Sequence, residues 1–184
     1  LVDPFCGSGT FPIEAAMMAA DIAPGMNRSF LAEEWKHLVP RKCWYDANEE
    51  AQDRINLNIE TDIQGFDIDP EALKAARANA KMAGVDKQRA VKDLRHPKPY
   101  GFIITNPPYG ERLEEKENLT QLYREIGESY ERLDKWSMYL ITSYEKAEND
   151  IGRKADKNRK IYNGMLKTYY YQFLGTRTQK KKRS

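Results

Sequence analysis

The chain has 184 residues, of which 40% are hydrophobic and 11% aromatic, as expected for one globular domain with a core of its own. No apolar run approaches the roughly 20 residues of a membrane span, and no secretory signal is visible, which argues against a membrane or exported protein. The two cysteines, Cys6 and Cys43, lack the spacing of a metal site or a disulfide framework. We therefore expect a cytoplasmic domain without a metal.

The net charge of +2 conceals two unequal parts. Residues 151–184 contain eleven Lys or Arg and one acid, a balance of +10, whereas residues 1–150 carry −8. The basic part mildly favours a nucleic-acid partner, although a solvated tail explains the last five residues better. The chain lacks an initiator Met and begins inside a predicted strand, so we expect it to be part of a longer polypeptide.

A strand, a glycine turn and a helix open the chain. The strand ends at Asp3, the turn contains Gly7 and Gly9, and apolar residues recur at helical spacing from Phe11 to Ala20. The turn lacks the third glycine of G-x-G-x-x-G and the Lys of a P-loop, so it forms no standard phosphate site. It either brings backbone close to a ligand, with Asp3 accepting from a ligand ammonium group, or supplies positive φ alone.

The next two predicted strands also end in carboxylates. Asp67 ends the first, where an acidic residue of such folds accepts from ribose hydroxyls, and Ile68 would lie against an adenine ring. Asp69 is predicted to cap the helix that Pro70 starts and Gly84 ends. Residues 90–95 predict a further strand, whose Asp93 could accept from an adenine amine beside Leu94.

The most informative stretch follows the apolar strand of residues 102–104. Because two prolines cannot continue a strand ladder, the strand must stop at Asn106, and Asn106-Pro107 should form a stiff platform. The Asn106 side-chain oxygen and a backbone carbonyl would then be two adjacent acceptors, with Tyr109 after Pro108 offering a flat ring. This pattern suits a planar substrate with an exocyclic NH2, although a Pro-rich turn capped by Asn is the alternative.

The remaining segments complete an α/β domain. A helix over 119–133 and a strand over 137–142 precede an antiparallel hairpin, whose Asn163-Gly164 predicts a type I′ turn. Alternating strands and helices imply a mostly parallel, Rossmann-like sheet, in which ligands bind at the carboxyl ends of strands. The residues at such ends are Asp3, Gly7, Gly9, Asp67, Asp93 and Asn106. Together they offer acceptors for an amine, a ribose and an adenine but no cradle for phosphate, which fits S-adenosylmethionine better than NAD or ATP.

These motifs resemble those of the class I S-adenosylmethionine-dependent amino-methyltransferases. Further stretches are similar to the THUMP-containing RNA methyltransferases, and most of all to the bacterial large-subunit rRNA guanine N2-methyltransferase group; they are residues 12–16, 22–25, 65–70, 106–112 and 159–164. The resemblance covers nearly the whole chain. It implies that residues 1–184 are the methyltransferase domain and that the THUMP-containing segment is absent from this sequence.

The resemblance also implies roles for individual residues. Asp3, Phe5, Gly7, Gly9 and Thr10 would line the methionine part of the cofactor, Asp67 would hold its ribose, and Ile68, Asp93 and Leu94 would surround its adenine. Asn106 and the Pro107 carbonyl would bind the target amine, while Tyr109 stacks on a base flipped out of its helix. The implied reaction is methylation of guanine N2 in large-subunit rRNA, with RNA as partner and no metal.

Three other functions use the same features. The platform Asn106-Pro107-Pro108-Tyr109 serves adenine amines in DNA or RNA equally well, and it also serves the amide of a protein glutamine, which the basic carboxyl-terminal part disfavours. A non-catalytic S-adenosylmethionine-binding RNA module is the alternative from another class. Replacing Asn106 would separate enzyme from module, because only transfer should be lost.

Overall fold

A computed structural model describes residues 1–86, 99–108 and 113–175 of the chain. It contains one six-stranded sheet in the order β2-β1-β3-β4-β6-β5. The strands are β1 (Val2–Asp3), β2 (Gln64–Gly65), β3 (Phe102–Thr105), β4 (Ser137–Thr142), β5 (Lys157–Asn163) and β6 (Leu166–Phe173). The four strands from β2 to β4 are parallel, and β6 and β5 join antiparallel. The predicted fold class is confirmed.

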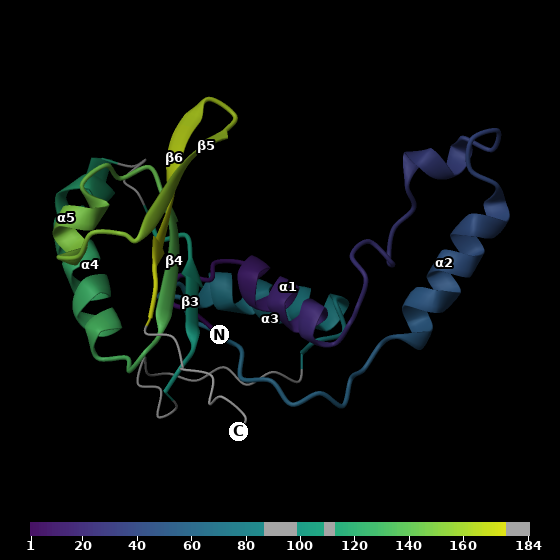
Figure 1. Ribbon diagram of the computed structural model, residues 1–184, viewed down its shortest axis with the longest axis horizontal. Coiled ribbons are helices and arrows are strands. Elements are labelled where there is room, and N and C mark those ends of the chain that lie inside the picture. Colours follow the sequence, from purple (N-terminus) through teal and green to yellow (C-terminus); the bar gives the residue numbers. More distant parts are fainter. Residues whose placement is uncertain (87–98, 109–112, 176–184) are drawn as a thin grey trace, which may run out of the picture.

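Helices cover both faces of this sheet (Figure 1). On one side lie α1 (Thr10–Ala19) and α3 (Pro70–Met82), and on the other α4 (Leu113–Glu131) and α5 (Ala147–Ile151). A 3₁₀ turn, η1 (Leu31–Glu34), and α2 (Arg41–Asp53) form an arm that stands away from the sheet. No helix in the described ranges is long and apolar enough to cross a bilayer.

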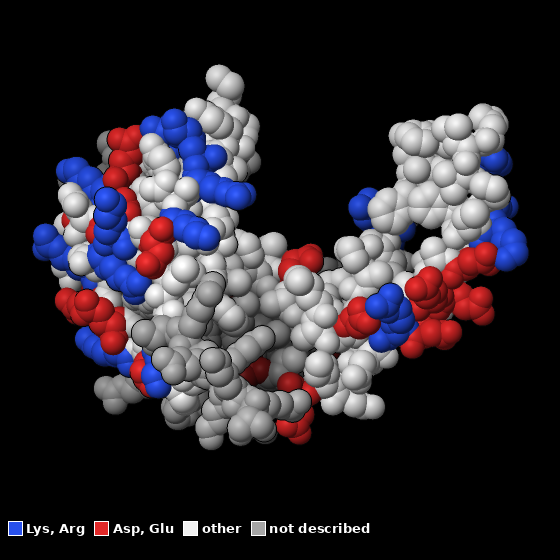
Figure 2. Space-filling model, in the orientation of Figure 1, with Lys and Arg blue, Asp and Glu red and all other residues white. Residues whose placement is uncertain are grey.

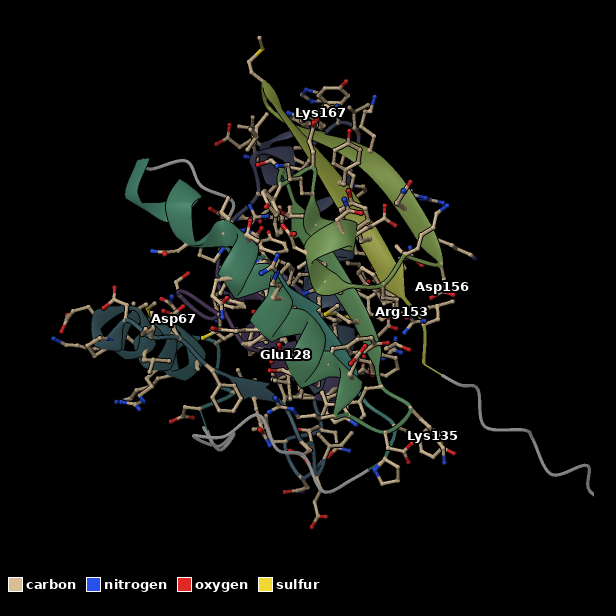
Figure 3. All side chains as sticks on the ribbon, turned by 90° about the vertical axis from the view of Figure 1, so that its left-hand side faces the viewer. Asp67, Glu128, Lys135, Arg153, Asp156 and Lys167 are labelled. Carbon is tan, nitrogen blue, oxygen red and sulfur yellow. The ribbon has the colours of Figure 1, made fainter. Side chains whose placement is uncertain are left out.

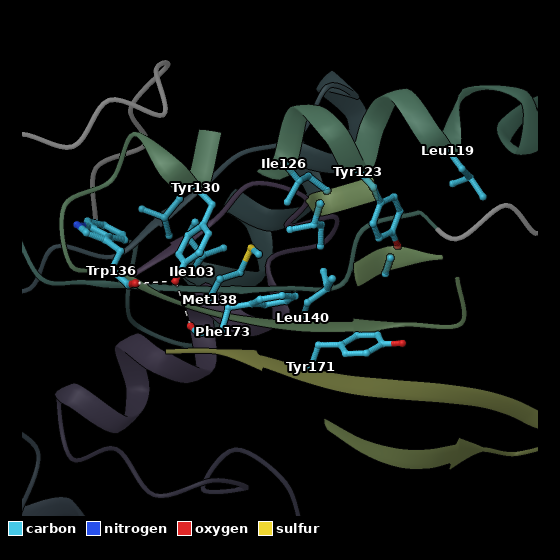
Figure 4. Close-up of a cluster of buried hydrophobic side chains, with 13 residues drawn as sticks. Ile103, Leu119, Tyr123, Ile126, Tyr130, Trp136, Met138, Leu140, Tyr171 and Phe173 are labelled. Carbon is cyan, nitrogen blue, oxygen red and sulfur yellow. Dashed lines mark hydrogen bonds between the residues drawn. The ribbon is translucent and has the colours of Figure 1, made fainter. Parts of the chain in front are cut away.

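The core lies between the sheet and α4 (Figure 4). Every second residue of β4 faces it, so that Met138 and Leu140 are completely buried, and Phe173 of β6 joins them. The Tyr130 hydroxyl lies 2.9 Å from the carbonyl oxygen of Trp136 and 3.2 Å from that of Phe173. Val2 of β1 and Ile103 of β3 belong to the same buried cluster, so the core holds in place the two strands that carry the site described below.

The hairpin turn differs from its prediction. Asn163 pairs with Leu166, so the two turn residues are Gly164 and Met165 instead of Asn163 and Gly164. Gly164, at the first turn position, has a φ of 60°, whereas the φ of Met165, at the second position, is not positive. This pattern is typical of a type II′ turn, which needs its glycine at that position.

Candidate active site

A buried carboxylate joins the two strands at the centre of the candidate site. Asp3 ends β1 and is only 1% exposed. Its Oδ1 accepts hydrogen bonds from the Thr105 hydroxyl at 2.6 Å and from the Phe5 backbone N–H at 3.2 Å. Thr105 is the last residue of β3 and directly precedes Asn106. One hydrogen bond therefore connects the predicted cofactor side of the site to the predicted substrate platform, across 102 positions of sequence.

This environment raises the pKa of the Asp3 carboxyl. The pKa of Asp3 is raised from 3.8 to about 6, mainly by burial; the hydrogen bonds from Thr105 and Phe5 oppose this rise, and the nearby carboxylate of Asp67 adds to it. A buried carboxylate whose ionised form is disfavoured in this way gains from a cation placed beside it. Such a perturbed group at the carboxyl edge of a parallel sheet is a candidate for ligand binding.

The glycine turn lies against the end of β2. The Gly7 N–H donates to Asp67 Oδ2 at 2.8 Å, and its φ is 52°. A Cβ added to Gly7 would meet no atom within 4 Å, whereas one on Gly9 would lie 3.0 Å from the Cβ of Ala76 in α3. Gly7 therefore leaves its outer surface open to a ligand, and Gly9 permits the close approach of α1 and α3. Both glycines have positive φ, 52° at Gly7 and 89° at Gly9, but only Gly7 also leaves space for a ligand.

Asp69, and not Asp67, caps α3, as predicted. Asp69 is the N-cap of α3 and accepts from the Glu71 N–H at 2.9 Å, while Asp67 lies two residues earlier, in the loop that precedes α3 (Figure 3). The Asp67 Oδ1 accepts from the Asp69 N–H at 3.0 Å. A carboxylate offers about four lone-pair positions, so these bonds leave acceptor capacity for a ligand hydroxyl. Ile68 is completely exposed, as is expected of an apolar side chain that packs against a ligand.

The Asn106-Pro107-Pro108 platform is supported from behind by α4. Asn106 and Pro108 are exposed, whereas the Pro107 side chain is fully buried. The hydroxyl of the buried Tyr123 donates to the Pro108 carbonyl oxygen at 3.4 Å and lies 2.5 Å from the Thr142 hydroxyl at the end of β4. The platform is thus anchored to the core while its amide side chain remains accessible.

The structure brings together most, but not all, of the predicted site residues. Asp3, Gly7, Asp67, Ile68 and Asn106 lie at the carboxyl ends of β1, β2 and β3. Three predicted residues, Asp93, Leu94 and Tyr109, lie outside the described residues. Phe5 packs partly against the core, and Thr10 is the exposed first residue of α1. Thr105, Tyr123 and Thr142 were not predicted from the sequence, because their hydrogen-bond partners are distant along the chain.

The donor and acceptor set determines what this site could hold. Carboxylates at two strand ends suit an ammonium group and hydroxyls, and the exposed Ile68 suits an apolar ring. Within the described ranges, no three His, Cys, Asp or Glu residues lie close enough to hold a metal ion. A separate cavity of about 130 Å³ lies between α1, β2 and α3, with Ile13 and Leu73 among its lining residues. Neither Asp3 nor Asn106 lines this cavity. The residues present therefore fit S-adenosylmethionine at the strand ends.

Comparisons with known proteins agree with this fit. Residues 1–172 match the family model of the RMKL-like methyltransferase domain (UPF0020). The chain is 45% identical to YpsC of Bacillus subtilis (strain 168), named as a candidate RNA methyltransferase, over 98% of this chain and 48% of that protein. It is 40% identical to the ribosomal RNA large subunit methyltransferase K/L of Shewanella baltica (strain OS185), over 90% of this chain and 25% of that protein.

Two solved structures share the fold at similar identity. SMU.472, described as a candidate methyltransferase complexed with SAH, superposes with a TM-score of 0.86 at 44% identity, over 97% of this chain and 48% of that one. A predicted N6-adenine-specific DNA methylase from Listeria monocytogenes (strain 4b F2365) gives a TM-score of 0.84 at 44% identity, over 95% and 46%. The chain thus spans about half the length of these structures, and a quarter to a half of the curated relatives.

Proposed function

Because the chain belongs to the RMKL-like methyltransferase domain family, we propose that it transfers methyl groups from S-adenosylmethionine to an exocyclic amine of a base in RNA. The observation that carries the proposal is the hydrogen bond between Asp3 and Thr105, since it joins a carboxylate suited to the cofactor to the platform suited to an amine. The name of the Shewanella relative favours large-subunit rRNA as the substrate, and the resemblance of the sequence motifs favours guanine N2 as the target atom.

The cofactor would lie along the carboxyl ends of β1 and β2. S-Adenosylmethionine supplies a methyl group on a sulfonium, which needs no metal to become electrophilic. The Asp3 carboxylate would pair with the methionine ammonium, and the open surface of Gly7 would admit the methionine chain, with Phe5, Gly9 and Thr10 around it. Asp67 would accept from the ribose hydroxyls, and Ile68 would cover the adenine, together with Asp93 and Leu94.

The platform would orient the target amine. The Asn106 side-chain oxygen and the Pro107 carbonyl would accept both N–H groups, which directs the nitrogen lone pair at the methyl group. The same two acceptors would stabilise the positive charge that develops on nitrogen as the new N–C bond forms and the S–C bond breaks. Tyr109 would stack on the flipped base, and the surplus amine proton would leave to solvent after transfer, so no strong general base is required.

Identification of the methylated nucleoside tests the proposal. The full-length protein is incubated with labelled S-adenosylmethionine and unmodified ribosomal RNA, and the digested nucleosides are separated by mass spectrometry. Labelled N2-methylguanosine is the expected product. Label in DNA or protein but not in RNA would reject the RNA substrate while leaving the platform chemistry in place.

The second candidate is an adenine amino-methyltransferase. It is favoured by the name of the Listeria structure and by the platform itself, which accepts from any planar exocyclic amine. In the same digest, labelled N6-methyladenosine instead of N2-methylguanosine would select this alternative.

A further inference from the structure

The β5–β6 hairpin extends beyond the strand ends that carry the site. The last pair between β4 and β6 joins Thr142 to Tyr169, whereas β5 and β6 continue pairing as far as Asn163 and Leu166. Because Thr142 is the carboxyl end of β4, the hairpin tip projects past the same edge of the sheet that holds Asp3 and Asn106. Figure 1 shows this tip standing clear of every helix, across from the arm that carries α2.

This hairpin carries exposed positive charge next to exposed apolar groups. Lys157, Arg159 and Lys160 are all exposed on β5, and within the described parts of the chain none of them forms an ion pair. Figure 2 shows Lys and Arg gathered where the hairpin borders the hollow between it and the arm. Towards the tip, Tyr162 is 64% exposed and Met165 completely exposed. Positive charges close to an exposed aromatic ring are typical of surfaces that bind single-stranded nucleic acids.

The pairing register separates these groups onto the two faces of the hairpin. Lys157 and Arg159 lie on one face of the hairpin and Lys160 and Tyr162 on the other, because successive strand residues point to opposite faces. Arg159 pairs with Tyr170, whose ring stacks on Tyr139 at 6.2 Å on the face opposite the core. Both faces of the hairpin therefore present a cation, and because β5 is the edge strand of the sheet, an RNA strand that lies along it could contact both.

We propose that the β5–β6 hairpin binds the RNA strand beside the target nucleotide, with Lys157, Arg159 and Lys160 on phosphates and Tyr162 stacked on a neighbouring base. The proposal rests on the proposed function, because it assigns the surface that presents the base to Asn106. Phosphate contacts position a strand without reading its sequence, and stacking tolerates every base. The hairpin thus holds the strand, while the platform selects the amine.

Salt-dependent RNA binding separates the two kinds of contact. For the full-length protein and an unmodified rRNA transcript, K157Q/R159Q/K160Q should weaken binding roughly 10- to 100-fold and lower the slope of log affinity against log salt by about 2. Tyr162→Ala should weaken binding about 5- to 150-fold without changing that slope, and Tyr162→Phe should restore the affinity because it retains the ring. The matched control is K74Q/R124Q/R132Q, which removes three exposed cations, one each in α3 and α4 and one directly after α4, and should leave binding unchanged.

Two further readouts keep this test separate from that of the proposed function. S-Adenosylmethionine affinity should be the same in all variants, which shows that the fold is intact. If the wild type methylates RNA but the β5 variant retains both affinity and salt slope, the hairpin proposal is overturned and the methyltransferase function stands. If the wild type neither binds nor methylates RNA, both proposals are overturned.

Discussion

Asp3→Asn should stabilise the ligand-free protein at alkaline pH. Burial raises the folded-state pKa of Asp3 from 3.8 to about 6, so above pH 6 the folded protein holds an ionised carboxylate that it disfavours. The shift of about two pKa units corresponds to a cost of about 3 kcal/mol at pH 8. Asparagine avoids this cost and still offers an oxygen to the Thr105 hydroxyl.

The sign of the pH dependence follows from proton binding. Between pH 3.8 and about 6 the folded state retains the Asp3 proton while the unfolded state has lost it, so wild-type stability falls as the pH rises through this window. The linkage relation gives a cost of about 1 kcal/mol at pH 4.5 and about 3 kcal/mol at pH 8. The stability advantage of Asp3→Asn over wild type should therefore grow by about 2 kcal/mol between these two pH values.

Urea unfolding of the 184-residue chain at both pH values measures this advantage. Taking the difference between variant and wild type cancels the titration of the other groups they share. Asp69→Asn is the control for loss of a carboxylate near the site, because asparagine is an equally good N-cap. An advantage of Asp3→Asn that stays constant, or shrinks as the pH rises, would refute the account of Asp3. The same variant should bind S-adenosylmethionine more weakly at pH 8, since it lacks the charge proposed to pair with the ammonium.

Two further predictions concern the support of the platform and the cysteines. Tyr123→Phe removes a buried hydroxyl that bonds the Pro108 carbonyl and the Thr142 hydroxyl, and it should lower the free energy of unfolding by about 1–3 kcal/mol. Tyr45→Phe, on an exposed ring, should change that free energy by less than about 0.5 kcal/mol, and equal effects of the two variants in urea titrations would show that the tether contributes nothing. Burial and the nearby Asp3 raise the pKa of the Cys6 thiol to about 11. At pH 8 a thiol reagent should therefore modify the exposed Cys43 quickly and Cys6 only on unfolding. Rapid modification of both cysteines would contradict the buried placement of Cys6.

Local signals in the sequence predicted much of the fold. The cap at Asp69, the end of the helix near Gly84 and the stop of β3 before two prolines all depend on neighbouring residues, and the structure confirms them. The hairpin was also predicted, but its turn was placed one residue too early. Asn163-Gly164 satisfies the type I′ preference locally, whereas the register of β6 on β4 decides which residues form the turn.

The candidate site was predicted less completely, for a physical reason. The topology of a parallel sheet is enough to predict that Asp3 and Asn106 share an edge. It does not predict that Thr105 links them or that Tyr123 reaches the Pro108 carbonyl, because those contacts depend on side-chain packing across distant segments. The helical spacing of Tyr123 with Leu119 and Ile126 indicates a buried ring, but it carries no information about the partners of the hydroxyl.

The most direct test of the central claim compares cofactor binding and methyl transfer in Asn106→Ala. Calorimetry with S-adenosylmethionine and single-turnover transfer to unmodified rRNA are measured on the full-length protein, with Asn48→Ala on the exposed face of α2 as control. The proposed role of Asn106 predicts an almost unchanged cofactor affinity and a transfer rate reduced by at least about 100-fold, as for loss of one transition-state hydrogen bond. Transfer at a near-normal rate would contradict the assignment of the Asn106 platform as the site that orients the amine.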